Sequence, residues 1–105
     1  MTKIFITGHR GMVGSALARK AESLGDHEIL TVSRDTLDLT NQSAVFDFLK
    51  VNKPDIVVIA AAKVGGIHAN ATYPADFIYE NLSIASNLIE GSRIAGVPRV
   101  LFLGS

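Results

Sequence analysis

The chain has 105 residues, with ten basic and ten acidic side chains and a formal net charge of zero. A neutral chain without a basic stretch argues against nucleic acid or an anionic membrane as its main partner. Because the sequence contains no cysteine, a disulfide framework and a thiolate metal site are excluded as well.

The first predicted strand is the apolar run at residues 4–6, and the apolar spacing after it predicts a helix over residues 12–24. Evenly spaced glycines lie between them in a G-x-x-G-x-x-G pattern. A strand that turns into a helix this way presents unpaired N–H groups and the positive helix end, which together form a seat for phosphate. The spacing differs from the commoner G-x-G-x-x-G, and a bare structural turn is the alternative. The cofactor-binding residues expected here are Gly8, Arg10, Gly11, Met12, Val13 and Gly14.

Further strands are predicted from the apolar runs that follow. Gly25 ends the first helix in the usual C-terminal role. Strands are expected at residues 28–33, 37–39, 55–61 and 99–104, with the second of these reached without a helix. Because the long runs are continuously apolar and alternate with helices, the sheet should be parallel and covered on both faces.

Two more helices are predicted between these strands. Asn41 is the expected N-cap of a helix that ends before Pro54, and a long helix should begin near Pro74 and end at Gly96. Apolar residues cover two faces of the long helix, namely Phe77, Ile84 and Leu88 on one and Ile78, Leu82, Ala85 and Ile89 on the other. One face should therefore meet the sheet, and the second needs another partner.

These elements predict an α/β fold, a Rossmann-type doubly wound parallel sheet that is incomplete at its C-terminal side. The expected strand order is 3-2-1-4-5, with the ligand crevice where the order reverses between strands 1 and 4.

The residue at the end of the second predicted strand distinguishes NAD-specific from NADP-specific sites. Sites specific for NAD place an acid about 20 residues past the glycine loop, whereas this strand ends in Arg34. A guanidinium can hold a 2′-phosphate through paired charged hydrogen bonds, and Arg10 can approach the same phosphate from the loop. The two arginines favour NADP(H), although Asp35 follows directly. The alternative is that both arginines are ordinary solvated surface side chains.

Other candidate residues also lie at strand ends. Asp38 can accept a hydrogen bond from adenine or serve as a plain turn or capping residue. Ala60, Ala61 and Ala62 are small enough to admit a cofactor, although tight helix–strand packing also selects small side chains. Asn81, predicted on the inner face of the long helix, needs hydrogen-bond partners and is interpreted as structural first. Ser105 stands at the carboxyl end of the last strand, where such sheets place reactive groups.

No metal site and no membrane segment are predicted. The three histidines are scattered without ligand spacing. The longest apolar stretches fall well short of the roughly 20 residues that a membrane helix needs, and no signal peptide is recognised. We expect a soluble, cytoplasmic protein.

With these residues assembled, the whole chain resembles the N-terminal part of the extended short-chain dehydrogenases/reductases. Within that group it is similar to the GDP-4-keto-6-deoxy-D-mannose 3,5-epimerase/4-reductases. The resemblance is carried by the glycine loop at residues 8–14 and by the segments AAAKVGGI at 60–67, TYPADFIY at 72–79 and LFLGS at 101–105.

The resemblance implies that Arg10 and Arg34 bind the 2′-phosphate of NADPH and that Asp38 meets the adenine. Ala61 and its neighbours would lie along the cofactor. Ser105 matches the serine of a Ser-Tyr-Lys triad that helps hold the substrate's C4 carbonyl. The family reaction epimerises C3 and C5 of the keto sugar and then reduces C4.

The family's Cys, His and Tyr-x-x-x-Lys residues would lie beyond residue 105. Residues 1–105 are therefore expected to be the N-terminal part of an NADP(H)-binding domain, without the substrate domain and inactive alone. The complete protein is expected to dimerise through the long helix. Two alternatives remain: a dinucleotide-sensing module without catalysis, or another nucleotide-sugar enzyme of the same group, many of which retain NAD.

Overall fold

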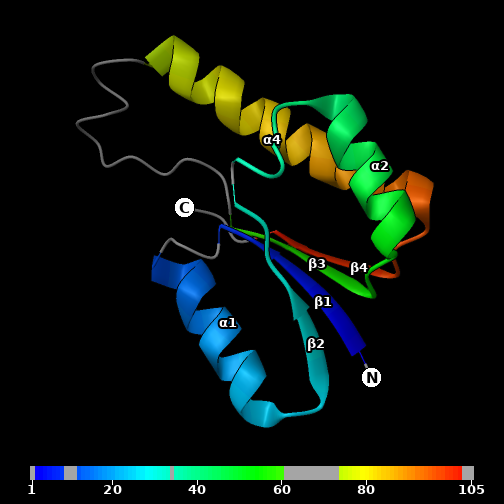
Figure 1. Ribbon diagram of the computed structural model, residues 1–105. Helices are drawn as coiled ribbons and strands as arrows, with labels where there is room; N and C mark the ends of the chain where they lie inside the picture. The colour runs from blue at the N-terminus through cyan, green and yellow to red at the C-terminus, as the bar shows by residue number, and fades with distance from the viewer. Residues whose placement is uncertain (1, 9–11, 34, 61–73, 103–105) are drawn as a thin grey trace.

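The computed structural model describes residues 2–8, 12–33, 35–60 and 74–102. Its four strands are β1 (Thr2–Thr7), β2 (His27–Leu30), β3 (Ile56–Ile59) and β4 (Arg99–Phe102). They form one parallel sheet with the order β2-β1-β3-β4. In Figure 1, α1 (Met12–Leu24) covers one face of this sheet, and α2 (Gln42–Asn52) and α4 (Pro74–Ala95) cover the other. The predicted α/β class with a doubly wound parallel sheet is confirmed.

The helices end at the capping and glycine residues that the sequence predicts. The bounds of α1 are those predicted, and Gly25 follows it with a φ of 77°, a conformation that glycine adopts without steric penalty. Asn41 is the N-cap of α2, as predicted, because its side-chain oxygen accepts a hydrogen bond from the Ala44 N–H at 3.1 Å. Pro74 opens α4 and Gly96, with a φ of 77°, closes it.

The strand predicted at residues 37–39 is wrong. The backbone N–H groups of Thr36 and Leu37 donate to the Ser33 carbonyl, and the Asn41 N–H donates to the Asp38 carbonyl at 3.0 Å. The segment therefore satisfies its hydrogen bonds locally, in turns, rather than with a neighbouring strand. The predicted order 3-2-1-4-5 becomes an observed sheet of four strands in the order expected for the other four. The second strand was predicted to reach residue 33, but β2 ends at Leu30, so Arg34 follows the strand by four residues instead of directly ending it.

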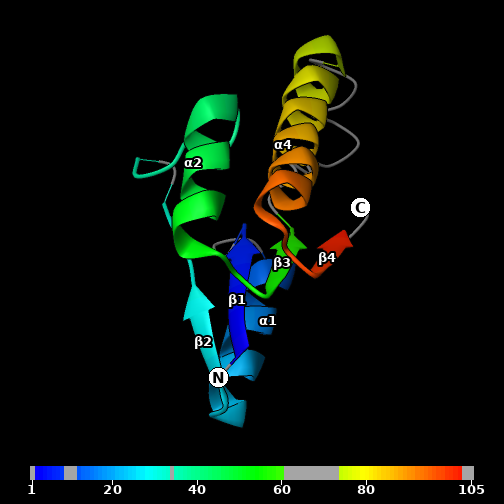
Figure 2. The same cartoon turned by 90° about the vertical axis from the view of Figure 1, so that its right-hand side faces the viewer.

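The core lies between the sheet and the pair α2 and α4. It is built from buried side chains of the sheet, of the two helices and of the segment before α2: Phe5, Leu37, Val45, Leu49, Val57, Ile59, Ile84 and Leu88. Leu82 and Ile89, on the second apolar face predicted for the long helix, are 61% and 49% exposed. Figure 2 shows α2 and α4 side by side above the sheet. They approach closely at Gly91, where an added Cβ would lie 2.8 Å from Leu49 Cδ1.

The last strand, β4, has the continuous apolar sequence of a buried strand, but its side chains are exposed. It pairs with β3 alone among the described strands, so it forms an edge of the sheet. Its side chains stay exposed, with Leu101 at 51% and Phe102 at 53%. A continuous apolar run is typical of a strand that is buried on both faces of a sheet. Burial also requires that another element covers each face.

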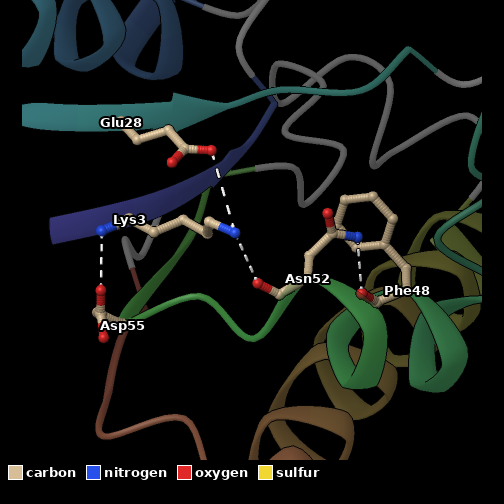
Figure 3. A network of polar contacts seen from close by, with 5 residues as sticks. All are labelled: Lys3, Glu28, Phe48, Asn52 and Asp55. Atoms are coloured by element: carbon tan, nitrogen blue, oxygen red, sulfur yellow. Dashed lines mark hydrogen bonds and ion pairs between the residues drawn. The ribbon is translucent and has the colours of Figure 1, made fainter. Parts of the chain in front are cut away.

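At the amino edge of the sheet, Lys3 in β1 connects β2, α2 and the residue that precedes β3 (Figure 3). Its backbone N–H donates to Asp55 Oδ2 and its carbonyl accepts from the Asp55 N–H, both at 2.8 Å. Its ammonium donates to the Asn52 carbonyl at the end of α2 at 2.9 Å and lies 4.0 Å from Glu28 in β2. A cation at a helix C-terminus is favourable. These contacts fix the end of the sheet that lies opposite the predicted site.

Candidate dinucleotide-binding site

The candidate site begins at the turn that follows β1. Phe5, Ile6 and Thr7 are buried, so the end of β1 lies in the interior of the molecule. The next residue, Gly8, has a φ of 73°, in the left-handed region that glycine occupies without a Cβ clash. A turn therefore begins at Gly8 directly after the strand, and glycine suits this position, as the glycine pattern predicts.

The helix that follows is positioned to receive an anion. Helix α1 begins at Met12, four residues after Gly8, and its first turn contains no acidic side chain. Its positive end is therefore not neutralised by a carboxylate of its own first turn. Gly14 is buried within that turn. A buried glycine without a side chain permits close packing between helix and strand.

A threonine links the two central strands at this edge. The Thr7 hydroxyl donates to the Val58 carbonyl at 2.9 Å and accepts a hydrogen bond from the Ala60 N–H at 3.2 Å. Thr7 is 3% exposed, so the hydroxyl depends on these protein partners. The bridge fixes the carboxyl ends of β1 and β3 relative to each other. Ligands bind between such strand ends when the strand order reverses there.

The segment that follows β2 borders the same edge. Leu30 pairs with Phe5, two residues before the end of β1, and the chain continues past β1 before it enters α2 (Figure 1). Asp38 is exposed in this segment. Its Oδ1 accepts from the Thr40 N–H at 2.9 Å and from the Thr40 hydroxyl at 2.6 Å. Asp38 thus has the turn role that we considered for it, and an adenine contact stays a prediction.

The structure brings part of the predicted site together. Gly8, the start of α1 and Ala60 lie at neighbouring ends of β1, α1 and β3. For Met12 and Val13 only the backbone is described. Asp35 is exposed. The predicted residues outside the described part of the chain are Arg10, Gly11, Arg34, Ala61, Ala62 and Ser105.

Two residues near the site were missed by the sequence reasoning. One is Thr7, whose position directly before Gly8 at the end of a buried strand was the available indication. The other is Asn87, which is 7% exposed and donates from Nδ2 to the Leu39 carbonyl at 2.9 Å. For Asn81, the amide that we predicted to be buried, the side chain lies outside what is described.

Other groups in the described residues do not suggest different chemistry. Arg93 donates two hydrogen bonds to Glu90 on the exposed surface of α4, at 2.6 and 2.9 Å. This hydrogen bonding lowers the pKa of Glu90, and solvent screening keeps the pair's contribution small. No cluster of three metal-ligating side chains and no helix able to cross a membrane occurs in the described ranges. The cytoplasmic location stays a prediction.

A parallel sheet with a glycine turn after a central strand and a helix N-terminus at its carboxyl edge defines a Rossmann-type nucleotide-binding fold. Comparison with known sequences agrees with this class. The chain belongs to the NAD dependent epimerase/dehydratase family, whose sequence model matches residues 4–105.

Individual relatives share about half of the residues. The chain is 53% identical over 103 residues to the GDP-L-fucose synthase of Escherichia coli (strain K12), covering 98% of this chain and 32% of that protein. It is 54% identical, over 98% of its length, to the GDP-L-fucose synthase of Sinorhizobium fredii, of which it also covers 32%. The chain thus spans about a third of the length of these curated relatives.

Among solved structures, one match is MlghC, a GDP-mannoheptose C4 reductase from Campylobacter jejuni with NADP bound. The TM-score is 0.91 and the sequences are 41% identical, with 98% of this chain and 32% of that chain covered. The likeness therefore extends over nearly all of the present fold.

Proposed function

We propose that this chain is the NADP(H)-binding part of an enzyme that makes GDP-L-fucose from GDP-4-keto-6-deoxy-D-mannose. The complete enzyme would epimerise C3 and C5 of the sugar and reduce C4. The observation that carries the cofactor assignment is the Gly8 turn between β1 and α1, with its left-handed backbone at the carboxyl edge of the sheet. The names of the relatives support the choice of sugar nucleotide.

The residues present fit a dinucleotide. The left-handed backbone of Gly8 and the buried Gly14 fit the glycine positions of a diphosphate site at the start of α1, whose first turn carries no acid. First-turn N–H groups and the helix dipole favour a negatively charged ligand there. When bound, NADPH supplies the hydride for reduction. The part of this chain is to hold and orient it.

The proposed roles of the remaining site residues follow from their places in the sequence. Arg10 and Arg34 would bind the 2′-phosphate, Asp38 the adenine, and Ala60 with Ala61 and Ala62 would border the cofactor. Ser105 would help hold the C4 carbonyl of the substrate. The Thr7 bridge supports this arrangement, because it keeps the β3 end that carries Ala60 beside the Gly8 turn.

Replacing Arg34 with alanine tests the choice of cofactor. A charged hydrogen bond contributes about 1.5–3 kcal/mol, so we expect Arg34→Ala to weaken NADPH binding by about 10- to 100-fold. NADH lacks the 2′-phosphate, and its affinity should stay within about twofold. Isothermal titration of both cofactors with the complete protein measures the two affinities.

A matched control is Arg93→Ala, which removes an exposed arginine of α4 that pairs with Glu90. It should leave both cofactor affinities unchanged. If Arg34→Ala weakens the binding of NADPH and NADH equally, Arg34 does not form a 2′-phosphate site.

The reaction is tested by supplying GDP-4-keto-6-deoxy-D-mannose and NADPH to the complete protein. Oxidation of NADPH at 340 nm, with GDP-L-fucose identified by mass spectrometry and NMR, is the expected result. NADPH binding without oxidation would favour the sensing alternative. Oxidation only with a different GDP-sugar would favour another member of the same group, since GDP-mannoheptose is the sugar nucleotide named for the C. jejuni protein.

The exposed side of α4 supports a homodimer. Tyr79, Leu82 and Ile89 are 74%, 61% and 49% exposed at spacings that place them on one helical face. We propose that a second copy covers this face. Leu82→Glu should then shift sedimentation of the complete protein from dimer to monomer, while Val51→Glu, at an 80% exposed site on α2, should not. A dimer that survives Leu82→Glu would contradict this interface.

A further inference from the structure

The side chain of Asn87 connects the long helix to a distant part of the chain. Asn87 lies on the buried side of α4 and is 7% exposed. Its Nδ2 donates to the Leu39 carbonyl at 2.9 Å, across 48 positions of sequence. Leu39 belongs to the segment of residues 37–41, which we call the β2–α2 segment. This contact joins α4 to the chain that leaves β2.

The β2–α2 segment has few other means of holding its position. It pairs with no strand among the described residues, because its backbone-to-backbone hydrogen bonds there are those of local turns. Leu37 anchors one end in the core at 6% exposure, and Asn41 anchors the other as the N-cap of α2. The bond from Asn87 holds the middle of the segment. The Leu39 carbonyl is partly buried, and the amide of Asn87, which is itself buried, supplies its donor. Asn87 therefore helps to set the orientation of this peptide.

The peptide that Asn87 holds directly follows Asp38. Leu37 and Leu39 face the core, while Asp38 between them is exposed at the carboxyl edge of the sheet. The Asp38 side chain is itself oriented, since Oδ1 accepts two hydrogen bonds from Thr40. In Rossmann-type folds the adenosine half of a dinucleotide lies beside the chain that follows the second strand. The segment held by Asn87 is therefore at the adenosine end of the candidate site.

We infer that Asn87 is a positioning residue for the adenosine half of the cofactor. It acts through the Leu39 carbonyl, keeps the β2–α2 segment against α4, and so fixes the edge on which the adenine rests. The inference depends on the proposed function, because it requires that the protein binds NADP(H). It is distinct from the glycine turn, which serves the diphosphate.

The test compares three ligands in the complete protein: NADPH, 2′,5′-ADP as its adenosine half, and reduced nicotinamide mononucleotide as its other half. Asn87→Leu keeps the size of the side chain and removes the donor. We expect affinity for NADPH and for 2′,5′-ADP to fall by up to about tenfold, because the lost hydrogen bond no longer holds the segment in its binding position. Affinity for the mononucleotide should stay within about twofold. Fluorescence titration measures all three.

Asn52→Leu is the matched control. The Asn52 side chain also donates from Nδ2 to a backbone carbonyl, that of Phe48, at 2.9 Å, but at the amino edge of the sheet. It should leave all three affinities unchanged. Asn87→His, which retains an N–H donor at similar reach, should recover most of the NADPH affinity lost in Asn87→Leu.

The outcomes separate the two proposals. A native protein that does not bind NADPH refutes the proposed function itself. A native protein that binds NADPH, together with an Asn87→Leu variant that binds it equally well or loses all three ligands equally, overturns the role of Asn87. If Asn87→Leu does not fold, Asn87→Ala is measured in the same way and judged by the same two results.

Discussion

Replacing Thr7 with valine tests whether the bridge between β1 and β3 holds the site together. Valine has the shape of threonine and the same β-branching, so packing and strand preference stay nearly constant. The change removes the hydroxyl that donates to the Val58 carbonyl and accepts from the Ala60 N–H. Any loss of stability therefore reports these two hydrogen bonds.

The expected magnitude follows from the burial of Thr7, which is 3% exposed. A neutral hydrogen bond contributes about 0.5–1.5 kcal/mol net, and a buried group left without its partner costs about 1–3 kcal/mol. Ala60 is only partly buried, so water can replace part of what its N–H loses. We expect Thr7→Val to lower the free energy of unfolding by about 2 kcal/mol.

Urea titration followed by circular dichroism measures this change. With a slope of about 2 kcal/mol/M, a loss of this size moves the midpoint by about 1 M. Thr7→Ser keeps the hydroxyl and loses one methyl group, which is worth about 1 kcal/mol. NADPH affinity should fall in Thr7→Val and persist in Thr7→Ser, since the Gly8 turn follows this residue directly. A valine variant with native stability and native NADPH affinity would refute the reasoning.

Two further predictions concern the helices. Gly91→Ala should lower the free energy of unfolding by about 1 kcal/mol, because overpacking at 2.8 Å from Leu49 Cδ1 outweighs the gain in helix propensity. Differential scanning calorimetry should show a lower unfolding midpoint for this variant. The double variant Gly91→Ala with Leu49→Val should recover part of the loss. Lys53→Gly should raise the free energy of unfolding by about 0.5–1 kcal/mol, since Lys53 caps α2 with a left-handed φ of 46° that glycine adopts more easily. The control Lys50→Gly, inside α2, should lower the free energy of unfolding. Urea titration of both variants measures this, and equal effects of the two glycines would contradict the role of the cap.

The helix ends and the central strands were predictable because their causes are local. Asn41, Gly25 and Gly96 act on backbone groups within a few residues of themselves, and each has its predicted role in the structure. The Gly8 turn is of the same kind. The order of the four observed strands also follows from the sequence, since buried parallel strands linked by helices admit few arrangements.

The failures came from features whose causes are not local. Leu37 and Leu39 alternate with Asp38 as they would in a strand, and both turn toward the core as expected. The same alternation of apolar and polar residues is found in a strand and in a turn-rich segment whose two leucines pack in the core. The difference lies in where the backbone hydrogen bonds go, here to the carbonyls of Ser33 and Asp38, three or four residues back along the chain. Exposure of β4 likewise depends on which elements cover it.

Asn87 shows why the supporting residues of a site are harder to find than the site itself. Phosphate seats have a local requirement for glycine and a helix start, and that requirement is visible as a motif. An asparagine that holds a carbonyl 48 positions away has no such pattern around it, because its partner is a backbone group that any residue could provide. Only the packing of α4 against the β2–α2 segment makes the amide necessary. If Asn87 positions the adenosine end as inferred, the affinity of the site for its cofactor depends in part on a residue whose hydrogen bond goes to the protein backbone.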